Sequence, residues 1–326
     1  MTQYTLKNKS GANVTLTDWG ATILAINVPD KNGKLVDVAL GHGTPEAVKL
    51  NDCYFGASCG RVANRISGAA FKLGGKTYKL VANTPPLILH GGDIGFSHLL
   101  WTAKNVSDSE VTFTLHSPDG DQGFPGAVDV SVTYTWNDQN TLGLTYTATT
   151  DAPTIVNLTN HTYFNLNGHD SGETLEHSIQ LDSDFYLPIN KLVGVTGEVR
   201  NVKDSPFDFK TPHKIGERIF GECQQLKHGN GYDHCYILNG EFAARAVGDK
   251  TGIAMEVYTD CPSIQFYSGC CLTPHDGKNG AKYDRFSGFC LETQYPPDFI
   301  NQPAFAKHIL LPGQTQIQKT EYRFSA

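Results

Sequence analysis

Two segments of the sequence hold ionisable and amide side chains between apolar residues, in a pattern suited to proton transfer. The first, 155–167, reads IVNLTNHTYFNLN. A strand period of two would collect its apolar residues on one face and place His161 and Tyr163, among Asn157, Thr159 and Asn165, on the other. This polar face is either a solvated surface or the wall of a cleft that meets a polar ligand. Because Asn and His are poor strand formers, their concentration suggests a reason beyond solubility.

The second segment, 289–298, reads FCLETQYPPD, and its two prolines would end a strand. A period of two puts Glu292 on the same side as Cys290 and Gln294, opposite the apolar residues. If that side is enclosed, desolvation raises the pKa of Glu292 toward neutrality and makes it a usable general base. If that side is open, Glu292 is an ordinary surface carboxylate opposite a core face.

Five further residues are candidates for ligand binding, each with a structural alternative. Asn64 and Arg65 lie in CGRVANRISG, where the arginine could clamp hydroxyl or carboxylate groups or form a structural ion pair. His90 closes LILHGG, whose glycines allow a close approach to a ligand, although a lone histidine often only packs. Asp233 follows a glycine turn, and its carboxylate either caps that turn or contacts a ligand. Gln265, in PSIQFY, could reach a ligand hydroxyl or merely bind backbone.

Motifs for metals and nucleotide cofactors are absent from the sequence. The chain has 12 histidines but no H-x-H or H-E-x-x-H pattern, and glycines interrupt the spacing of His161, His169 and His177. No G-x-G-x-x-G follows a clear strand, and neither a phosphate-binding P-loop nor a G-x-S-x-G nucleophile motif is present. We therefore expect no catalytic metal and no cofactor.

Composition argues against several classes of protein. The chain has 26 Lys and Arg against 33 Asp and Glu, with no basic run, so we expect no nucleic-acid partner. Apolar stretches such as Ala21–Val28 are far shorter than the ~20 residues that span a bilayer, so we expect no membrane partner. The N-terminal MTQYTLK lacks the apolar part of a secretory signal, which favours a cytoplasmic protein. The eight cysteines form no C-x-x-C pair and are expected to be reduced thiols.

Short β-rich runs separated by turn signals recur along the chain and predict an all-β fold. Helices are expected only at Pro45–Lys49, Phe207–Lys210 and Lys214–Phe220, so a βαβ parallel sheet is disfavoured. We expect a single domain over residues 1–326, a large antiparallel β-sandwich with few short helices. The runs expected to be strands are Val14–Thr17, Ile23–Val28, Ala70–Leu73, Lys76–Leu80, Val111–His116, Val128–Trp136, Leu142–Ala148, Ser178–Leu181, Cys235–Leu238, Ala254–Thr259, Ile264–Tyr267 and Thr315–Phe324.

Taken in order along the chain, these motifs resemble those of the aldose 1-epimerase (galactose mutarotase) family. The resemblance is carried by GRVANRISG, LILHGG, NHTYFNLNGH, GYDHCYIL, QFYSG and CLETQYPPDFINQP, and it extends from about residue 11 to the end. It implies a galactose mutarotase-like supersandwich with an open, polar sugar cleft. It also implies that the chain interconverts the α and β anomers of free hexoses such as galactose and glucose, without a cofactor.

The resemblance assigns roles by motif position. It implies His161 as the proton donor and Glu292 as the base, and the sugar contacts it implies are Asn64, Arg65, His90, Tyr163, Asp233 and Gln265. A carboxylate and an imidazole at opposite ends of the O1–C1–O5 unit suffice to open and reclose the ring. Glu292 should then be ionised and His161 protonated at the start, with pKa values near the working pH.

Three alternatives use the same residues differently. A hexose-6-phosphate 1-epimerase would need more cations than Arg65 and Arg61 to hold the phosphate. A non-catalytic carbohydrate-binding protein would need neither His161 nor Glu292. A glycosidase would need two carboxylates across the bond, which Asp233 and Glu292 could supply. The expected partner is a small aldohexose, and the expected assembly is a monomer or a weak homodimer.

Overall fold

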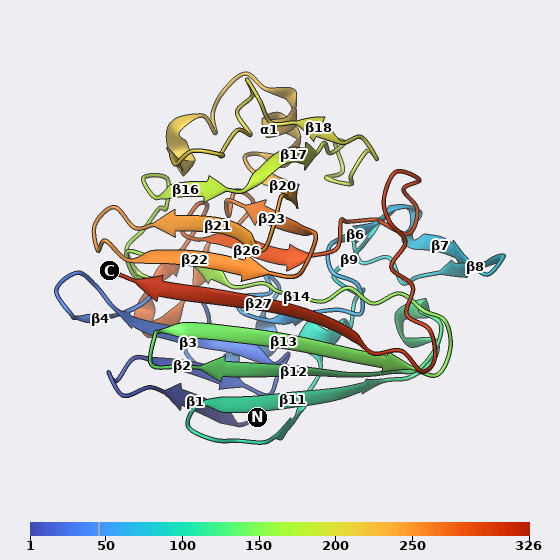
Figure 1. The fold of residues 1–326 in the computed structure, drawn as a ribbon, viewed down its shortest axis with the longest axis horizontal. Coiled ribbons are helices and arrows are strands. Elements are labelled where there is room, and N and C mark those ends of the chain that lie inside the picture. The colour runs from blue at the N-terminus through green and yellow to red at the C-terminus, as the bar shows by residue number, and fades with distance from the viewer. Residues whose placement is uncertain (45) are drawn as a thin grey trace.

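A nine-stranded antiparallel sheet crosses the molecule and forms one layer of the fold (Figure 1). The computed structural model describes residues 1–44 and 46–326. The long strands of this sheet bury every second residue, as in Val128–Trp136, because one face packs and the other meets solvent. In spatial order the strands are β10 (Thr102–Lys104), β11 (Glu110–Ser117), β12 (Val128–Trp136), β13 (Thr141–Thr150), β27 (Gln316–Ser325), β22 (Ala254–Thr259), β21 (Phe242–Val247), β16 (Ser178–Leu181) and β19 (His213–Lys214).

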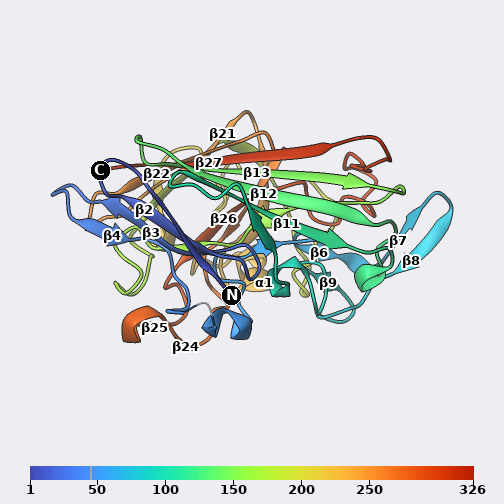
Figure 2. The same ribbon diagram turned by 90° about the horizontal axis from the view of Figure 1, so that it is seen from below.

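Two smaller sheets lie against the inner face of this layer (Figure 2). The four-stranded sheet contains β1 (Gln3–Lys7), β2 (Asn13–Thr17), β3 (Thr22–Pro29) and β4 (Leu35–Asp37). The six-stranded sheet contains β15 (Tyr163–Phe164), β26 (Phe289–Gln294), β23 (Ser263–Tyr267), β20 (Asp233–Leu238), β17 (Ser183–Leu187) and β18 (Arg200–Asn201). Two-stranded ladders pair β5 (Ser58–Cys59) with β14 (Thr159–Asn160), β6 (Arg65–Ile66) with β9 (Ile88–Leu89), β7 (Ala70–Leu73) with β8 (Lys76–Lys79), and β24 (His275–Asp276) with β25 (Lys282–Tyr283).

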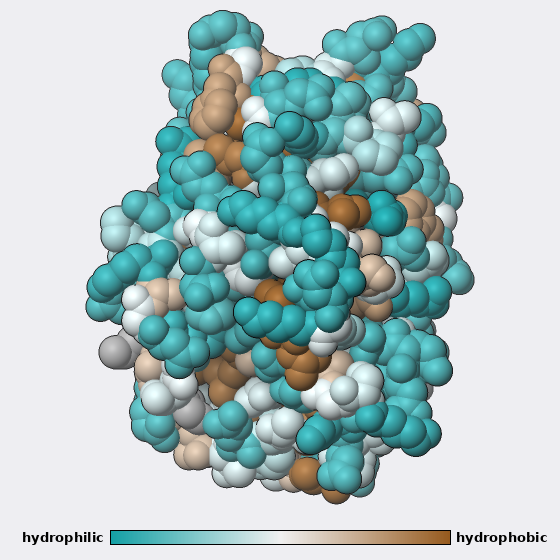
Figure 3. Space-filling model, turned by 90° about the vertical axis from the view of Figure 1, so that its left-hand side faces the viewer, coloured by the Kyte–Doolittle hydropathy of each residue, from teal (hydrophilic) through white to brown (hydrophobic). Residues whose placement is uncertain are grey.

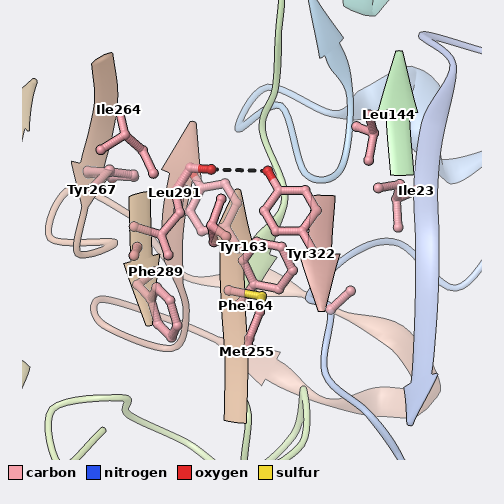
Figure 4. Packing of buried hydrophobic residues seen from close by; sticks show 14 of the residues in the cluster. Ile23, Leu144, Tyr163, Phe164, Met255, Ile264, Tyr267, Phe289, Leu291 and Tyr322 are labelled. Atoms are coloured by element: carbon pink, nitrogen blue, oxygen red, sulfur yellow. Dashed lines mark hydrogen bonds between the residues drawn. The ribbon is translucent and has the colours of Figure 1, made fainter. Parts of the chain in front are cut away.

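The outer surface and the space between the layers differ sharply in polarity. Seen from one side, the surface is mostly hydrophilic, with hydrophobic residues in small separate patches (Figure 3). Between the layers, Leu144 of β13 lies near Ile23 of β3, and Tyr322 of β27 packs beside Leu291 of β26 (Figure 4). The Tyr322 hydroxyl donates to the Leu291 carbonyl over 3.1 Å, so a hydrogen bond joins the two large sheets. The predicted antiparallel β-sandwich is therefore confirmed, whereas the extent of one domain over 1–326 stays a prediction.

Helices are few and short, as predicted, but one of the predicted positions is wrong. Phe207–Lys210 is irregular, whereas Lys214–Phe220 contains a single 3₁₀ turn. The predicted helix at Pro45–Lys49 appears as a 3₁₀ turn, and Pro45 itself lies outside the described residues. The helices are α1 (Gln224–Gly229) and the 3₁₀ turns η1 (Ala47–Leu50), η2 (Ser67–Ala69), η3 (Phe96–His98), η4 (Asp121–Gly123), η5 (Ile215–Glu217) and η6 (Lys278–Gly280).

The strand predictions are largely confirmed, with one instructive error. The predicted runs coincide with strands to within a few residues, because alternating burial sets both the pattern and the pairing. The segment 155–167, predicted as one strand, is instead divided between β14 and β15. β14 pairs with β5 and β15 pairs with β26, so the chain leaves one sheet and enters another between them.

Two further findings concern the cysteines and the helices. All eight cysteines are free thiols, and five of them are buried. Among residues 1–44 and 46–326, no helix has the length and apolar character needed to cross a bilayer.

Candidate active site

The face of the six-stranded sheet that points away from the nine-stranded sheet carries the ionisable residues. In the strand register Glu292 lies opposite Gln265, and Asp233 lies opposite Tyr267. These positions share one face, since neighbours across an antiparallel ladder point the same way. The alternate residues, such as Leu291, pack into the core between the layers. The strand alternation read from the sequence therefore predicted the correct face for Glu292.

His161 lies where the chain passes from β14 to β15. Its backbone amide donates to the Ala57 carbonyl over 2.9 Å, and its ring stacks on Tyr163 with the centroids 5.1 Å apart. Tyr54 covers the other side, with ring centroids 5.7 Å apart. The imidazole is held between two aromatic rings, which fixes its direction toward Glu292.

These side chains line a cleft with a volume of about 250 Å³. The cleft contains seven of the eight residues that the sequence proposed for the site, and Gln265 is the exception. Its other lining residues are aromatic, sulfur-containing or apolar, apart from one aspartate. The lining residues are Asp52, Cys53, Tyr54, Asn64, Arg65, Leu89, His90, His161, Tyr163, Val193, Asp233, Tyr267, Cys271, Leu272 and Glu292.

Glu292 and His161 form a buried pair on the cleft wall. Glu292 Oε1 lies 3.7 Å from His161 Nε2, and the two side chains are 3% and 7% exposed. Burial raises the pKa of Glu292 well above its usual range; the Asp233 charge adds to this, and Arg65 opposes it. Burial, with a smaller contribution from the charge of Arg65, lowers the pKa of His161 to about 4, although a backbone hydrogen bond opposes the shift. Without a sugar these shifts favour a neutral carboxyl and a neutral imidazole, whereas the ionised pair expected at the start of ring opening stays a prediction.

Asp233 is held by two neighbours from different elements. Gln265 Nε2 donates to Asp233 Oδ1 over 2.6 Å, and Arg65 Nη1 lies 3.9 Å from Asp233 Oδ2. Gln265 is 3% exposed and is not among the residues that line the cleft, and its predicted contact with a sugar stays a prediction. Arg65 keeps donors free, because its contact with Asp233 is long.

Asn64 and His90 form a second polar corner on a strained turn. Both residues have positive φ, 61° and 49°, which Asn tolerates better than most residues. The His90 amide donates to the Asn64 carbonyl over 3.0 Å, and the Asn64 amide donates to His90 Nδ1 over 3.2 Å. Burial lowers the pKa of His90, and the neighbouring His161 and Arg65 lower it further. A neutral His90 that accepts at Nδ1 carries its proton on Nε2, where it can donate to a ligand.

Arg61, which the sequence offered as a possible second cation of the cleft, is structural. It is 2% exposed, and its guanidinium donates to the carbonyls of Pro125 and Gly126 over 3.0 and 2.7 Å. Arg65 is thus the sole Lys or Arg among the lining residues that the structure describes. A phosphate-holding cluster of cations is not formed there.

Several lining residues escaped the sequence analysis. Tyr54 stacks over His161 and lies over His90 with ring centroids 4.8 Å apart, and Tyr267 shares a face with Glu292. The adjacent Cys53-Tyr54 follows a polar turn and gave no periodic signal. Tyr267 could have been found, because the register of QFY beside LETQ places it there.

Among the residues that the structure describes, side chains that could ligate a metal gather at two places. His90, His161 and Glu292 offer ligand atoms within 4.8 Å of one another in the cleft, and Asp52, Cys53 and His275 do so at its mouth. In the first group the Nδ1 atoms face Asn64 and Cys290, the latter over 3.5 Å. The sequence contains no metal-binding motif, so neither group was predicted from it.

Comparison with known proteins places this cleft in a family. The family model described as aldose 1-epimerase matches residues 2–323. The chain is 43% identical to human galactose mutarotase over 317 residues, covering 96% of this chain and 91% of the relative. It is 36% identical to the aldose 1-epimerase of Escherichia coli, covering 99% and 94%. A crystal structure of an aldose epimerase homologue from C. elegans superposes with a TM-score of 0.93 at 30% identity, covering 99% of this chain and 98% of that one.

The class of protein follows from fold and site together: an antiparallel supersandwich with a polar cleft and a buried carboxyl–imidazole pair. The chain belongs to the aldose 1-epimerase family.

Proposed function

We propose that this cleft opens and recloses the ring of free aldohexoses through Glu292 and His161. The chain is an aldose 1-epimerase, an isomerase that interconverts the α and β anomers of small sugars. The observation that carries the residue assignment is the buried pair, whose facing atoms lie 3.7 Å apart in a cleft of about 250 Å³. Both groups can exchange protons with a sugar that lies between them and the cleft mouth.

The productive state of the pair has one proton, on His161. The ionised Glu292 removes the proton of the C1 hydroxyl while His161 Nε2 gives one to the ring oxygen, and the C1–O5 bond breaks. The pair then holds a neutral carboxyl and a neutral imidazole. This is the arrangement that burial favours, so the cleft stabilises the pair in the open-chain stage. After rotation about C1–C2, the same steps run backwards on the other face of the aldehyde.

The sugar itself helps to ionise Glu292. Its Oε2 atom is buried without a hydrogen-bond partner among the described residues. A sugar hydroxyl that donates to this oxygen favours the charged carboxylate and lowers its pKa. Substrate binding therefore moves the pair toward the state that ring opening needs.

The remaining polar residues orient the ring while C1 inverts. Arg65 and the Nε2–H of His90 are donors, and Asp233 is an acceptor that Gln265 and Arg65 hold in place. Fixing several hydroxyls around the reacting carbon converts binding into correct orientation. Tyr163 and Tyr54 pack against the His161 ring, and Tyr163, which lines the cleft, is also proposed to contact the sugar.

Polarimetry tests the proposal directly. Freshly dissolved α-D-galactose and α-D-glucose should approach their equilibrium rotation faster with the protein than without it, in proportion to protein concentration. Glucose 6-phosphate serves as the comparison. Its phosphate would meet only one cationic side chain, Arg65, among the described residues of the cleft lining. A marked preference for the phosphate over both free sugars would favour the hexose-6-phosphate epimerase instead. Cytoplasmic localisation and a monomeric or weakly dimeric state remain part of this proposal.

A further inference from the structure

A second group of reactive side chains lies at the mouth of the cleft and takes no part in the mechanism above. It consists of Asp52, Cys53 and His275, whose ligand atoms all lie within 4.8 Å of one another. His275 Nε2 lies 3.2 Å from Cys53 Sγ and 2.9 Å from Asp52 Oδ1. Two segments distant in sequence meet here, the turn after η1 and the β24–β25 hairpin, which lie side by side below the sheets (Figure 2).

The spacing suits a tetrahedral metal ion. With Zn–N and Zn–O bonds of about 2.0–2.2 Å and Zn–S bonds of about 2.3 Å, two ligands at a tetrahedral angle lie roughly 3.3–3.6 Å apart. The distances found are a few tenths of an ångström shorter. The third pair, Asp52 and Cys53, has its ligand atoms within 4.8 Å of each other, so small shifts of these side chains bring all three atoms to bonding distance of one ion. Asp52 is exposed, so a fourth position is open to water.

The surroundings hold the ligands in the orientation a metal requires. The Nδ1–H of His275 donates to the Thr273 carbonyl, which leaves Nε2 for the ion, as is usual for ligating histidines. The His275 ring also packs edge-on against buried Phe55, with centroids 5.7 Å apart. Asn51 clamps the turn that carries the other two ligands: its Nδ2 donates to the Phe55 carbonyl over 3.0 Å, and its Oδ1 accepts from the Phe55 amide over 2.9 Å.

We propose that Asp52, Cys53 and His275 form a site for a divalent transition metal, Zn²⁺ by ligand chemistry, distinct from the catalytic pair. A thiolate, an imidazole and a carboxylate are the ligands that suit Zn²⁺. The ion forms a bond with Cys53 Sγ and releases the thiol proton to solvent, with no change in oxidation state. Burial raises the pKa of this thiol to about 12, so the proton is present at neutral pH and must be displaced.

Occupancy of this site reaches the cleft through the chain itself. Asp52 and Cys53 line the cleft, and the next residue, Tyr54, stacks over His161. An ion that ties this turn to the β24–β25 hairpin restricts the cleft mouth and holds Tyr54 in one position. We therefore expect Zn²⁺ to slow the epimerase, an effect that rests on the proposed function, whereas metal binding itself does not.

Metal binding is tested first, without sugar. Chelator-stripped protein is titrated with Zn²⁺ in competition with a chromophoric chelator, and with Co²⁺, whose bond to a thiolate absorbs in the near ultraviolet. We expect one ion per chain and a thiolate–Co²⁺ band. Cys53→Ala, His275→Gln and the exposed Asp52→Asn should each weaken Zn²⁺ binding at least about tenfold. Thermal unfolding of each variant shows whether its fold is intact, and Asp52→Asn keeps the test valid if a buried variant unfolds.

Matched controls separate this site from its neighbours. Cys271→Ala removes another thiol of the cleft, and His161→Asn removes a ligand of the catalytic group. Both should keep the Zn²⁺ affinity and the Co²⁺ band. Undiminished binding in Cys53→Ala or His275→Gln, or no saturable binding by the wild type, would overturn the proposal. Inhibition is measured separately by polarimetry, so an inactive protein that still binds Zn²⁺ through these residues refutes only the proposed function.

Discussion

At the scale of single residues, the proposed chemistry depends on a carboxyl and an imidazole whose environments oppose their charged forms. The sequence predicted both residues, since strand alternation and motif position singled out His161 and Glu292. It could not predict their protonation, because desolvation depends on how completely other segments enclose them. Tyr54, from the turn after η1, and Tyr163, from β15, provide that enclosure for His161.

Glu292→Gln should become more stable relative to the wild type as the pH rises. Burial raises the pKa of Glu292 in the folded protein, so the folded state binds the proton more tightly than the unfolded state does. The resulting contribution to the free energy of unfolding is fully present at pH values below the pKa of the unfolded state. It is lost as the pH rises through the pKa of the folded state. Each unit of elevation corresponds to about 1.4 kcal/mol. Urea unfolding between pH 4 and pH 9 should show the variant gaining on the wild type toward high pH. Equal pH dependence of the two proteins would mean that Glu292 is not perturbed by burial; Glu256→Gln, half-buried on the outer sheet, is the control.

Arg65→Ala should mainly weaken sugar binding, because the proposed role of its donors is to hold hydroxyls and not to exchange protons. A lost charge-assisted hydrogen bond costs about 1.5–3 kcal/mol, which corresponds to roughly a 10- to 150-fold rise in KM. Steady-state kinetics on galactose measures this, with Arg245→Ala, which lies in an exposed ion pair with Glu256, as the control. A large drop in unfolding temperature with KM unchanged would instead assign Arg65 a structural role.

At the scale of elements, the alternation of strand residues predicted the structure better than helix and strand propensities did. The face of Glu292 was predictable because β26 is a regular strand whose alternation survives in the sequence. The segment 155–167 shows the same alternation, but it is shared between two sheets, and pairing partners far along the chain decide where it breaks. The short helices were hard to predict for a related reason, because their local sequence signals are weak. Helix α1 has no side-chain cap at its start, and the one local signal is Asn230, which adopts the left-handed conformation after its end.

Tyr322→Phe tests the hydrogen bond that joins β27 to β26. Removing the hydroxyl should cost about 0.5–1.5 kcal/mol and lower the unfolding temperature by a few degrees, because the Leu291 carbonyl loses a buried donor. Calorimetry measures the shift. Tyr258→Phe, whose hydroxyl donates to half-exposed Glu256 on the outer sheet, should change stability less. If both variants behave alike, the bond between the sheets contributes no more than a surface contact.

At the scale of the whole molecule, the two layers have different roles: one covers the core and the other carries the residues of the cleft. The nine-stranded sheet covers the core, while the opposite face of the six-stranded sheet holds the cleft. Composition and turn spacing predicted this all-β class, since many short strands need many turns. They could not predict the cleft mouth, where Asp52 and His275 meet, because neither residue belongs to a periodic pattern.

Chelation should leave the basal epimerase rate intact. The proton transfer proposed for Glu292 and His161 needs no Lewis acid, and a metal ion bound by Asp52, Cys53 and His275 is proposed to restrict activity and not to support it. Dialysis against EDTA followed by polarimetry checks this, with the expected rate equal to or above that of the untreated protein. A large loss that a divalent ion restores would contradict a metal-independent mechanism.

The most direct test of the central claim is kcat/KM for α-D-galactose from about pH 4 to pH 10, by polarimetry, in the wild type, Glu292→Gln and His161→Asn. The wild type should give a bell-shaped profile, because ring opening needs exactly one proton on the pair, and its two apparent pKa values belong to the pair. Each variant should lose about 10²–10⁴-fold in rate, and His161→Asn should lose the alkaline limb. A Glu292→Gln enzyme within a few-fold of the wild type, or an unchanged alkaline limb in His161→Asn, would contradict the account.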